Sequence, residues 1–318
     1  MPGLHSMYLS RNPTPTPLLR SQPPNRSSPK LAAAVRPPGT ATHFMTPLSG
    51  GGQVDPLLPL PDLPAQVKEK ILCLEIMGVD SGRALALNPS LRAAPLDSLH
   101  SVVSYLLSKG IHHKDMARIF GMCPGALTAD IHADLAPVFR FLARDLGVPA
   151  ANFRRVVNKC PRLLVCSARD QLRPALLFLQ RLGLRDTAAL AYQDPVLLAS
   201  SVERTLLPKV EYLALELGLG RRGAAAMVGR CPALLTFSVE NNFRPKYTYL
   251  VGEMGRGPQE VQDFPQYFAF SLEKRIKPRH RDMEARRLRL PLPDMLKSTD
   301  DEFRALLDEA ERRGIYSS

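Results

Sequence analysis

The sequence predicts an all-α protein, an α-solenoid of about six or seven tandem helical repeats. Three observations support this fold class. Two sets of prolines recur with a constant offset, a helix N-cap residue precedes each proline of the second set, and no run of several residues alternates with the period of a β-strand. The first set lies at positions 124, 161, 195, 232 and 265, and the second lies 13 residues later, at positions 137, 174, 208, 245 and 278.

The segment that precedes the repeats, residues 1–54, is predicted to be a disordered transit peptide. It contains ten prolines and five basic residues, and no Asp or Glu occurs before Asp55. A basic, acid-free and Ser-rich start is typical of organelle targeting segments, and it lacks the continuous apolar core of a secretory signal. Because the prolines would interrupt the amphipathic helix of a mitochondrial presequence, a chloroplast destination is favoured. A mitochondrial destination and an ordinary disordered tail are the alternatives.

The repeat array is expected to span residues 55–290, with two helices in each unit. The first helix begins at an N-cap residue seven positions before the second proline, namely at Asp130, Ser167, Ser201, Ser238 and Ser271. Apolar residues such as Leu172, Leu176 and Leu179 recur at helical spacing. The second proline must either kink this helix or restart it. A glycine such as Gly183 ends the helix as a C′ residue.

The second helix of each unit, for example residues 152–159, ends at the first proline, and the residues after that proline fit one 3₁₀ turn. Weaker copies of the unit lie between residues 67 and 110. A helix pair exposes its apolar face unless a neighbour covers it, so the units are expected to stack. Residues 291–318 contain four basic and seven acidic residues and are predicted to form an acidic helical cap, docked by Phe303, Leu306 and Leu307.

The sequences of the repeats resemble those of the mTERF family of organellar transcription termination factor-like proteins. The similarity rests on the paired prolines, on C-P-x-L-L after one helix, and on L-R-P-x-x-x-F-L-x-x-L-G-L in the next, and it covers about residues 57–300. Residues 264–280 are similar to the last repeat of plant, especially plastid, members. The resemblance implies a non-enzymatic factor that binds organellar RNA or double-stranded DNA and acts in transcription termination, transcript processing or splicing. Other organellar expression proteins are further expected partners.

Basic residues are the candidate nucleic-acid contacts, because equivalent positions of stacked repeats fall in a row that can follow a phosphate backbone. The residues that flank the second proline are Arg173, Lys209, Arg244, Lys246, Lys277 and Arg279. The densest stretch, residues 273–289, adds Lys274, Arg275 and Arg281, and a further cluster comprises Arg154, Arg155, Lys159 and Arg162. The alternative is a helical scaffold that binds another protein and uses these charges as a solvated face.

Composition and motifs narrow the remaining function classes. The net charge of +12 and the pI near 9.7 favour a polyanionic partner. The five cysteines are widely spaced and include no C-x₂₋₄-C pair, so neither a metal nor a cofactor is expected. No phosphate-binding loop, H-E-x-x-H or G-x-S-x-G motif is present, which argues against an enzyme. No apolar run is long enough to cross a bilayer, so no membrane partner is expected, and the protein is expected to be a monomer.

Overall fold

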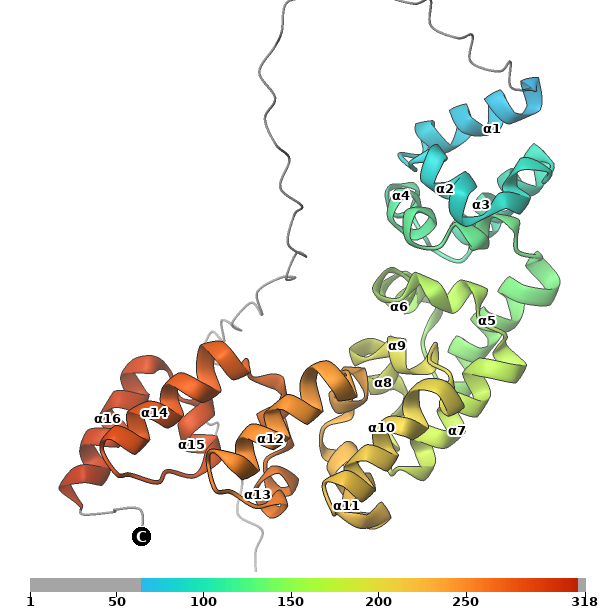
Figure 1. Cartoon of the computed structure of the whole chain (residues 1–318). Coiled ribbons are helices and arrows are strands. Elements are labelled where there is room, and N and C mark those ends of the chain that lie inside the picture. Colours follow the sequence, from blue (N-terminus) through green and yellow to red (C-terminus); the bar gives the residue numbers. More distant parts are fainter. Residues whose placement is uncertain (1–63, 314–318) are drawn as a thin grey trace, which may run out of the picture. The chain divides into compact units, whose positions relative to one another are not determined.

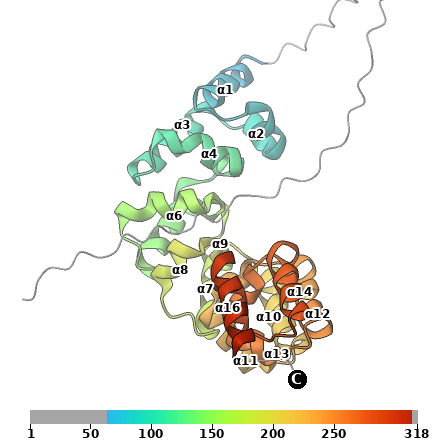
Figure 2. The same ribbon diagram turned by 90° about the vertical axis from the view of Figure 1, so that its left-hand side faces the viewer.

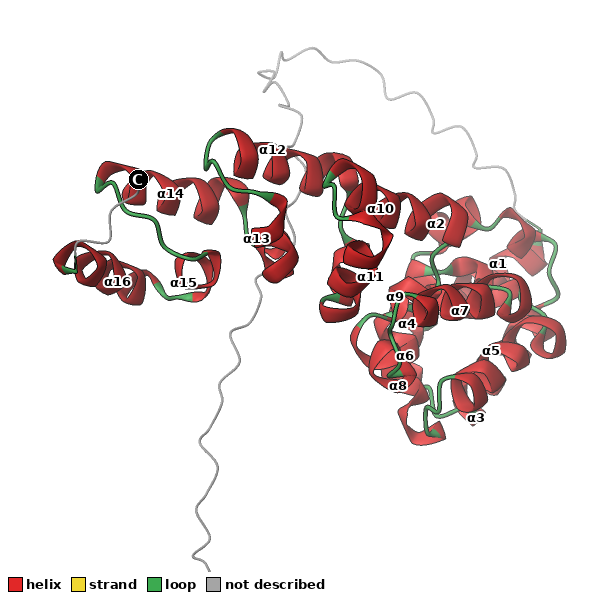
Figure 3. Ribbon diagram, turned by 90° about the horizontal axis from the view of Figure 1, so that it is seen from below, coloured by secondary structure: helices red, strands yellow, loops and turns green. Residues whose placement is uncertain are grey.

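The computed structural model describes residues 64–313, and over this range the chain forms helices and connecting turns with no β-strand (Figures 1 and 3). The predicted all-α fold is therefore confirmed. No helix within these residues is both long and apolar enough to span a membrane. The predicted transit peptide, residues 1–54, lies outside the described part of the chain.

Each of the first six repeats consists of an A helix, a B helix and a short closing turn, and a seventh A helix ends the array. The A helices are α1 (Ala65–Ile76), α3 (Leu96–Ser108), α5 (Ala136–Arg140), α7 (Arg173–Arg181), α10 (Leu207–Glu211), α12 (Arg244–Gly252) and α14 (Lys277–Ala285). The B helices are α2 (Ser81–Leu87), α4 (His113–Met122), α6 (Phe153–Lys159), α8 (Thr187–Gln193), α11 (Gly220–Arg230) and α13 (Pro258–Asp263). The closing turns are 3₁₀ helices at Pro89–Arg92, Pro124–Thr128, Pro161–Val165, Pro232–Thr236 and Pro265–Ala269, whereas the turn after α8 is the short α9 (Pro195–Leu198).

A π-helical turn precedes the proline of the later A helices and explains how these helices tolerate it. The predicted caps are present: Ser167 Oγ, for example, accepts from the backbone N–H of Asp170 at 3.1 Å. The Ser167 carbonyl accepts from the N–H of Gln171, four residues on, and also from the N–H of Leu172, five residues on, both at 3.0 Å. Proline clashes with the carbonyl four residues earlier in a regular α-helix, and the wider π turn displaces that carbonyl. The helix therefore continues through Pro174 in right-handed geometry and is not restarted.

Glycines end the A helices as predicted, and one repeat lacks its glycine. Gly147, Gly183 and Gly218 have φ values of +69°, +95° and +67°, which is the left-handed region that favours glycine. The equivalent position after α14 is Arg287, whose φ is +58°. Since a residue that bears a Cβ is strained in the left-handed region, the backbone at Arg287 destabilises the last repeat locally, and the earlier repeats avoid this strain.

Successive repeats pack through their B helices and share one apolar core. Contacts join α2 to α4, α4 to α6, α6 to α8, and α11 to α13, and Figure 2 shows the first of these helices following one another. Buried residues such as Leu74, Phe120, Leu164 and Phe243 belong to one continuous hydrophobic cluster. Each repeat thus covers the apolar face that its neighbour would otherwise expose.

A C-terminal cap of two helices follows the array. It comprises α15 (Leu292–Lys297) and α16 (Asp300–Arg312). The N-terminus of α16 has a capping box, in which the Thr299 side chain accepts from the Glu302 N–H and the Glu302 carboxylate accepts from the Thr299 N–H. Phe303 and Leu307 are buried, and Leu306 is half-buried, in agreement with the predicted docking residues.

We expect Arg287→Gly to stabilise the protein by about 1 kcal/mol, because glycine removes the strain of the left-handed backbone. For a domain of this size the melting temperature should rise by about 2–4 °C, measured by circular dichroism.

The matched control is Gly183→Arg, which should lower the melting temperature. A Cβ at position 183 would meet no atom within 4 Å, so the expected loss reflects backbone strain and not a clash. A melting temperature unchanged or lowered by Arg287→Gly would contradict the assignment of strain to this position.

Candidate nucleic-acid interface

The recurring cation directly after the second proline has a structural task in the fold. Lys209, Lys246 and Arg279 each donate a hydrogen bond to a backbone carbonyl oxygen, at 2.5, 2.6 and 2.6 Å. The acceptors belong to Leu235, Phe268 and Met295, which lie in the turn that follows the B helix or in α15. Lys70 in α1 makes the same bond, to the Arg92 carbonyl at 2.6 Å. The recurrence of these cations therefore has a cause within the fold, because each satisfies a carbonyl at the closing turn.

Burial makes these cations poor candidates for phosphate contacts. Lys246 is 7% exposed, and burial lowers the pKa of its ammonium group to about 8. Burial also lowers the pKa of Lys209. Arg279 is 4% exposed, and it pairs with Asp300 at 2.5 Å in addition to its carbonyl bonds. The structure thus places Lys246 and Arg279 inside the repeat and leaves Lys209 half-buried, so the three cations do not form the exposed row expected from the sequence.

The dense basic stretch of residues 273–289 is largely neutralised within the molecule. Arg275 donates to the Leu296 carbonyl at 2.9 Å, which ties α15 to the last repeat. Four surface ion pairs account for further charges, namely Lys277–Glu273, Arg286–Asp308, Arg286–Glu311 and Arg289–Glu260. Among the described residues, the basic side chains left without a hydrogen bond or ion pair in this stretch are Lys274, Arg281 and Arg287. The local excess of positive charge therefore serves mainly to hold the acidic cap.

The cluster around α6 divides between structural and exposed side chains. Arg154 makes a bidentate pair with Asp115 of α4, at 2.6 and 3.0 Å, and this pair holds the pKa of the Asp115 carboxyl well below its ordinary value. Arg155 is exposed, and its guanidinium carbon lies 5.1 Å from the centre of the Tyr192 ring. Lys159 and Arg162 are also exposed, although the Lys159 ammonium donates to the Tyr192 carbonyl at 2.9 Å.

Two predicted residues, Arg173 and Arg244, lie on the surface in ion pairs. Arg173 pairs with Asp145 at 3.3 Å, and Arg244 pairs with Glu240 at 3.1 Å. Exposed pairs of this kind contribute little to stability, about 0–1 kcal/mol. They nevertheless place a carboxylate beside each guanidinium, which weakens its attraction for a phosphate group.

The structure reveals a row of three exposed arginines that the sequence analysis did not single out as a set. We call Arg83, Arg118 and Arg155 the basic row; they lie on α2, α4 and α6, each six residues before the first proline of its repeat. These B helices pack on one another in sequence, so the three arginines occupy the same position on neighbouring helices. Arg83 and Arg118 line one shallow groove of about 310 Å³ between α2 and α4.

The basic row could have been found from the sequence, because its members are separated by 35 and 37 residues. The first two repeats lack the second proline, so Arg83 and Arg118 do not belong to the set of cations that flank that proline. The row ends after α6, because Ala189 and Ala226 hold the same position in α8 and α11.

The cysteines form no metal site in the part of the chain that the structure covers. No group of three or more His, Cys, Asp or Glu side chains is arranged to hold an ion there. Cys123, Cys160 and Cys166 are buried, and burial raises the pKa of the Cys166 thiol to about 11. These thiols therefore behave as small apolar side chains.

The buried ammonium of Lys246 should give the protein a measurable pH dependence of stability. The folded chain releases this proton near pH 8 and the unfolded chain near pH 10.5, so between these values the unfolded state binds more protons. Stability contributed by this site therefore rises with pH. Relative to a Lys246→Met variant, we expect the wild type to gain about 1–2 kcal/mol between pH 7 and pH 9.5, measured by urea unfolding.

The control for this experiment is Lys274→Met, which removes an exposed lysine of the same region. Its unfolding free energy should differ from that of the wild type by an amount that does not change with pH. An equally constant difference for Lys246→Met would show that the lysine is not desolvated in the folded protein.

Comparison with known proteins agrees with the repeat architecture. The mTERF family profile matches residues 66–216 and, in a second overlapping match, residues 185–304. The chain is also similar to the chloroplastic transcription termination factor MTERF2 of Arabidopsis thaliana, with 34% identity over 181 residues. This alignment covers 56% of the chain and 22% of that relative, so the chain spans about a fifth of the length of the protein that it matches.

Proposed function

This chain belongs to the mTERF family, and from that premise we propose that it binds plastid nucleic acid and acts in transcription termination and in the processing or splicing of plastid transcripts. Proteins of this family are non-enzymatic factors associated with organellar nucleic-acid binding. The chloroplast is favoured because the relative from Arabidopsis thaliana is chloroplastic and because residues 1–54 have the composition of a transit peptide.

The basic row is the single observation that carries the proposed binding. Packed helices lie about 8–10 Å apart, so arginines at one position of successive B helices form a ladder of positive charge. Within the described residues, none of the three side chains is ion-paired with a carboxylate. Arginine forks match phosphate oxygens in a bidentate manner, and the flexible side chains adapt to the spacing of a sugar–phosphate strand.

Other exposed cations extend the proposed surface. Lys159 and Arg162 lie at and just beyond the end of α6, and Arg221 is exposed on α11. Contacts of this kind neutralise phosphates without reading bases, so they support affinity and leave the target sequence to other features. Binding of this type releases counterions and falls steeply as salt concentration rises.

Replacing Arg83, Arg118 and Arg155 together by Gln should weaken nucleic-acid binding at least tenfold at about 0.1 M salt. The slope of log affinity against log salt should become shallower by about two to three, since three phosphate contacts are lost. Fluorescence anisotropy with single-stranded RNA and with duplex DNA of one sequence measures both quantities and distinguishes the two nucleic acids.

A triple variant of equal charge change, Arg173→Gln with Arg244→Gln and Lys277→Gln, is the matched control, because these side chains are balanced by Asp145, Glu240 and Glu273. It should bind nearly as well as the wild type. Equal losses for the two triple variants would mean that net charge, and not the basic row, determines binding.

The proposed plastid location can be tested with the predicted transit peptide, residues 1–54. A fusion of residues 1–54 to a fluorescent protein should enter isolated chloroplasts and be shortened there, as seen on a gel. Import into isolated mitochondria with exclusion from chloroplasts would place the same function in the mitochondrion, and import into neither organelle would overturn the targeting proposal.

A further inference from the structure

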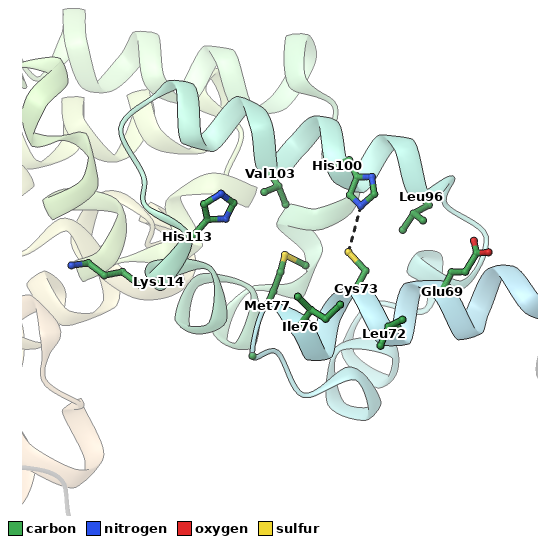
Figure 4. Close-up of a pocket in the computed structure, with 11 residues that line it drawn as sticks. Glu69, Leu72, Cys73, Ile76, Met77, Leu96, His100, Val103, His113 and Lys114 are labelled. Carbon is green, nitrogen blue, oxygen red and sulfur yellow. Dashed lines mark hydrogen bonds between the residues drawn. The ribbon is translucent and has the colours of Figure 1, made fainter.

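The N-terminal repeat has an open apolar groove of about 760 Å³ between α1, α3 and the start of α4 (Figure 4). Its lining includes Cys73 of α1, Met77 just after α1, and Leu96 and Val103 of α3. Leu72 and Ile76 of α1 also line the groove, and they are 61% and 77% exposed. Two large aliphatic side chains, one helical turn apart, thus lie at the surface next to an apolar depression.

The exposed pair is unusual among the A helices of this protein. When α1 is aligned with the later A helices on its buried Lys70, the positions of Leu72 and Ile76 correspond to Arg140 and Arg144 before α6 and to Thr248 and Gly252 in α12. The A helix that contains α7 and the one that begins with α10 each have one leucine there, Leu177 and Leu215, accompanied by Arg181 or Glu211. Only α1, among the described A helices, combines two aliphatic residues at these positions, and such a patch marks an interaction surface.

Charges at the two ends of the groove have opposite signs. Glu69 lies at one end, and Lys114 lies at the other end beside His113, with the apolar residues and His100 between them (Figure 4). Glu69 and Lys114 are both exposed. A surface that is acidic at one end and basic at the other is complementary to itself after a two-fold rotation.

We propose that this groove binds a second copy of the chain, with α1 of one protomer antiparallel to α1 of the other. The two-fold axis passes near the middle of Leu72 and Ile76, so these residues of each protomer cover the groove of the other. Glu69 of each protomer then lies beside Lys114 of its partner. The proposal replaces the monomer expected from the sequence with a symmetric dimer.

The size of the groove determines the kind of dimer. One helix from each protomer and four exposed aliphatic side chains form a contact at the small end of specific interfaces. The dimer should therefore be weak and dependent on concentration, with dissociation in the micromolar range. The contact leaves the arginines of the basic row out of the interface that we describe, so dimerisation and nucleic-acid binding can be measured separately.

Sedimentation velocity of the full 318-residue chain over a range of concentrations tests the proposal. The wild type should shift from monomer to dimer, and Ile76→Asp should weaken self-association at least tenfold, because the carboxylate would be buried against apolar residues. The matched control is Leu215→Asp, since Leu215 is 76% exposed at the equivalent position of another A helix. Leu215→Asp should dimerise as the wild type does.

Charge reversal provides a second test that does not depend on the apolar residues. Glu69→Lys and Lys114→Glu should each weaken the dimer by placing like charges together, and the double variant should restore it. A wild type that stays monomeric to several hundred micromolar overturns the proposal. So does a dimer that Leu215→Asp disrupts as strongly as Ile76→Asp, or one whose double charge variant is weaker than both single variants.

Discussion

The hydrogen bond from an A helix to the closing turn of its own repeat is the interaction on which the hairpins depend. In five of the seven described repeats, a side chain of the A helix or of the turn that begins it donates a hydrogen bond to a carbonyl oxygen near the end of the hairpin. Lysine does so in three repeats and arginine in the last, where the acceptor lies in α15, while Gln171 donates to the Ala199 carbonyl at 2.7 Å in the repeat that contains α7. Different side chains thus perform one task, which ties the end of each of these five hairpins to its beginning.

Most of the fold followed from the sequence because its signals are local. Proline removes a backbone donor, serine and aspartate cap helices, and glycine allows a positive φ, so these residues mark helix boundaries wherever they stand. The π turn before Pro174 could not be predicted in this way. The same residues are compatible with a kinked helix, with a helix that restarts at the proline and with a widened turn. The short α9 in place of a 3₁₀ turn likewise depends on packing and not on the proline that starts it.

The candidate interface was less predictable, because the sequence does not distinguish a charged residue that is exposed to solvent from one that is buried against a carbonyl. Lys246 and Arg279 recur with the regularity expected of a binding row, yet they are buried donors. Arg83 and Arg118 recur with equal regularity and are exposed. Only the position of the closing turns and of the acidic cap separates the two groups. Regular spacing in a repeat protein therefore identifies equivalent positions, but burial determines what each position does.

The acidic cap alters the long-range electrostatic field of the protein. Its carboxylates lie beside Arg279 and Arg286, so the field of the last repeat is largely cancelled, whereas Arg83, Arg118 and Arg155 of the first three repeats have no carboxylate partner among the described residues. An approaching polyanion is steered by the summed field before any contact forms. Encounters should therefore begin at the N-terminal repeats, and the capped end should act as a region of low attraction that gives a bound strand a preferred direction of entry.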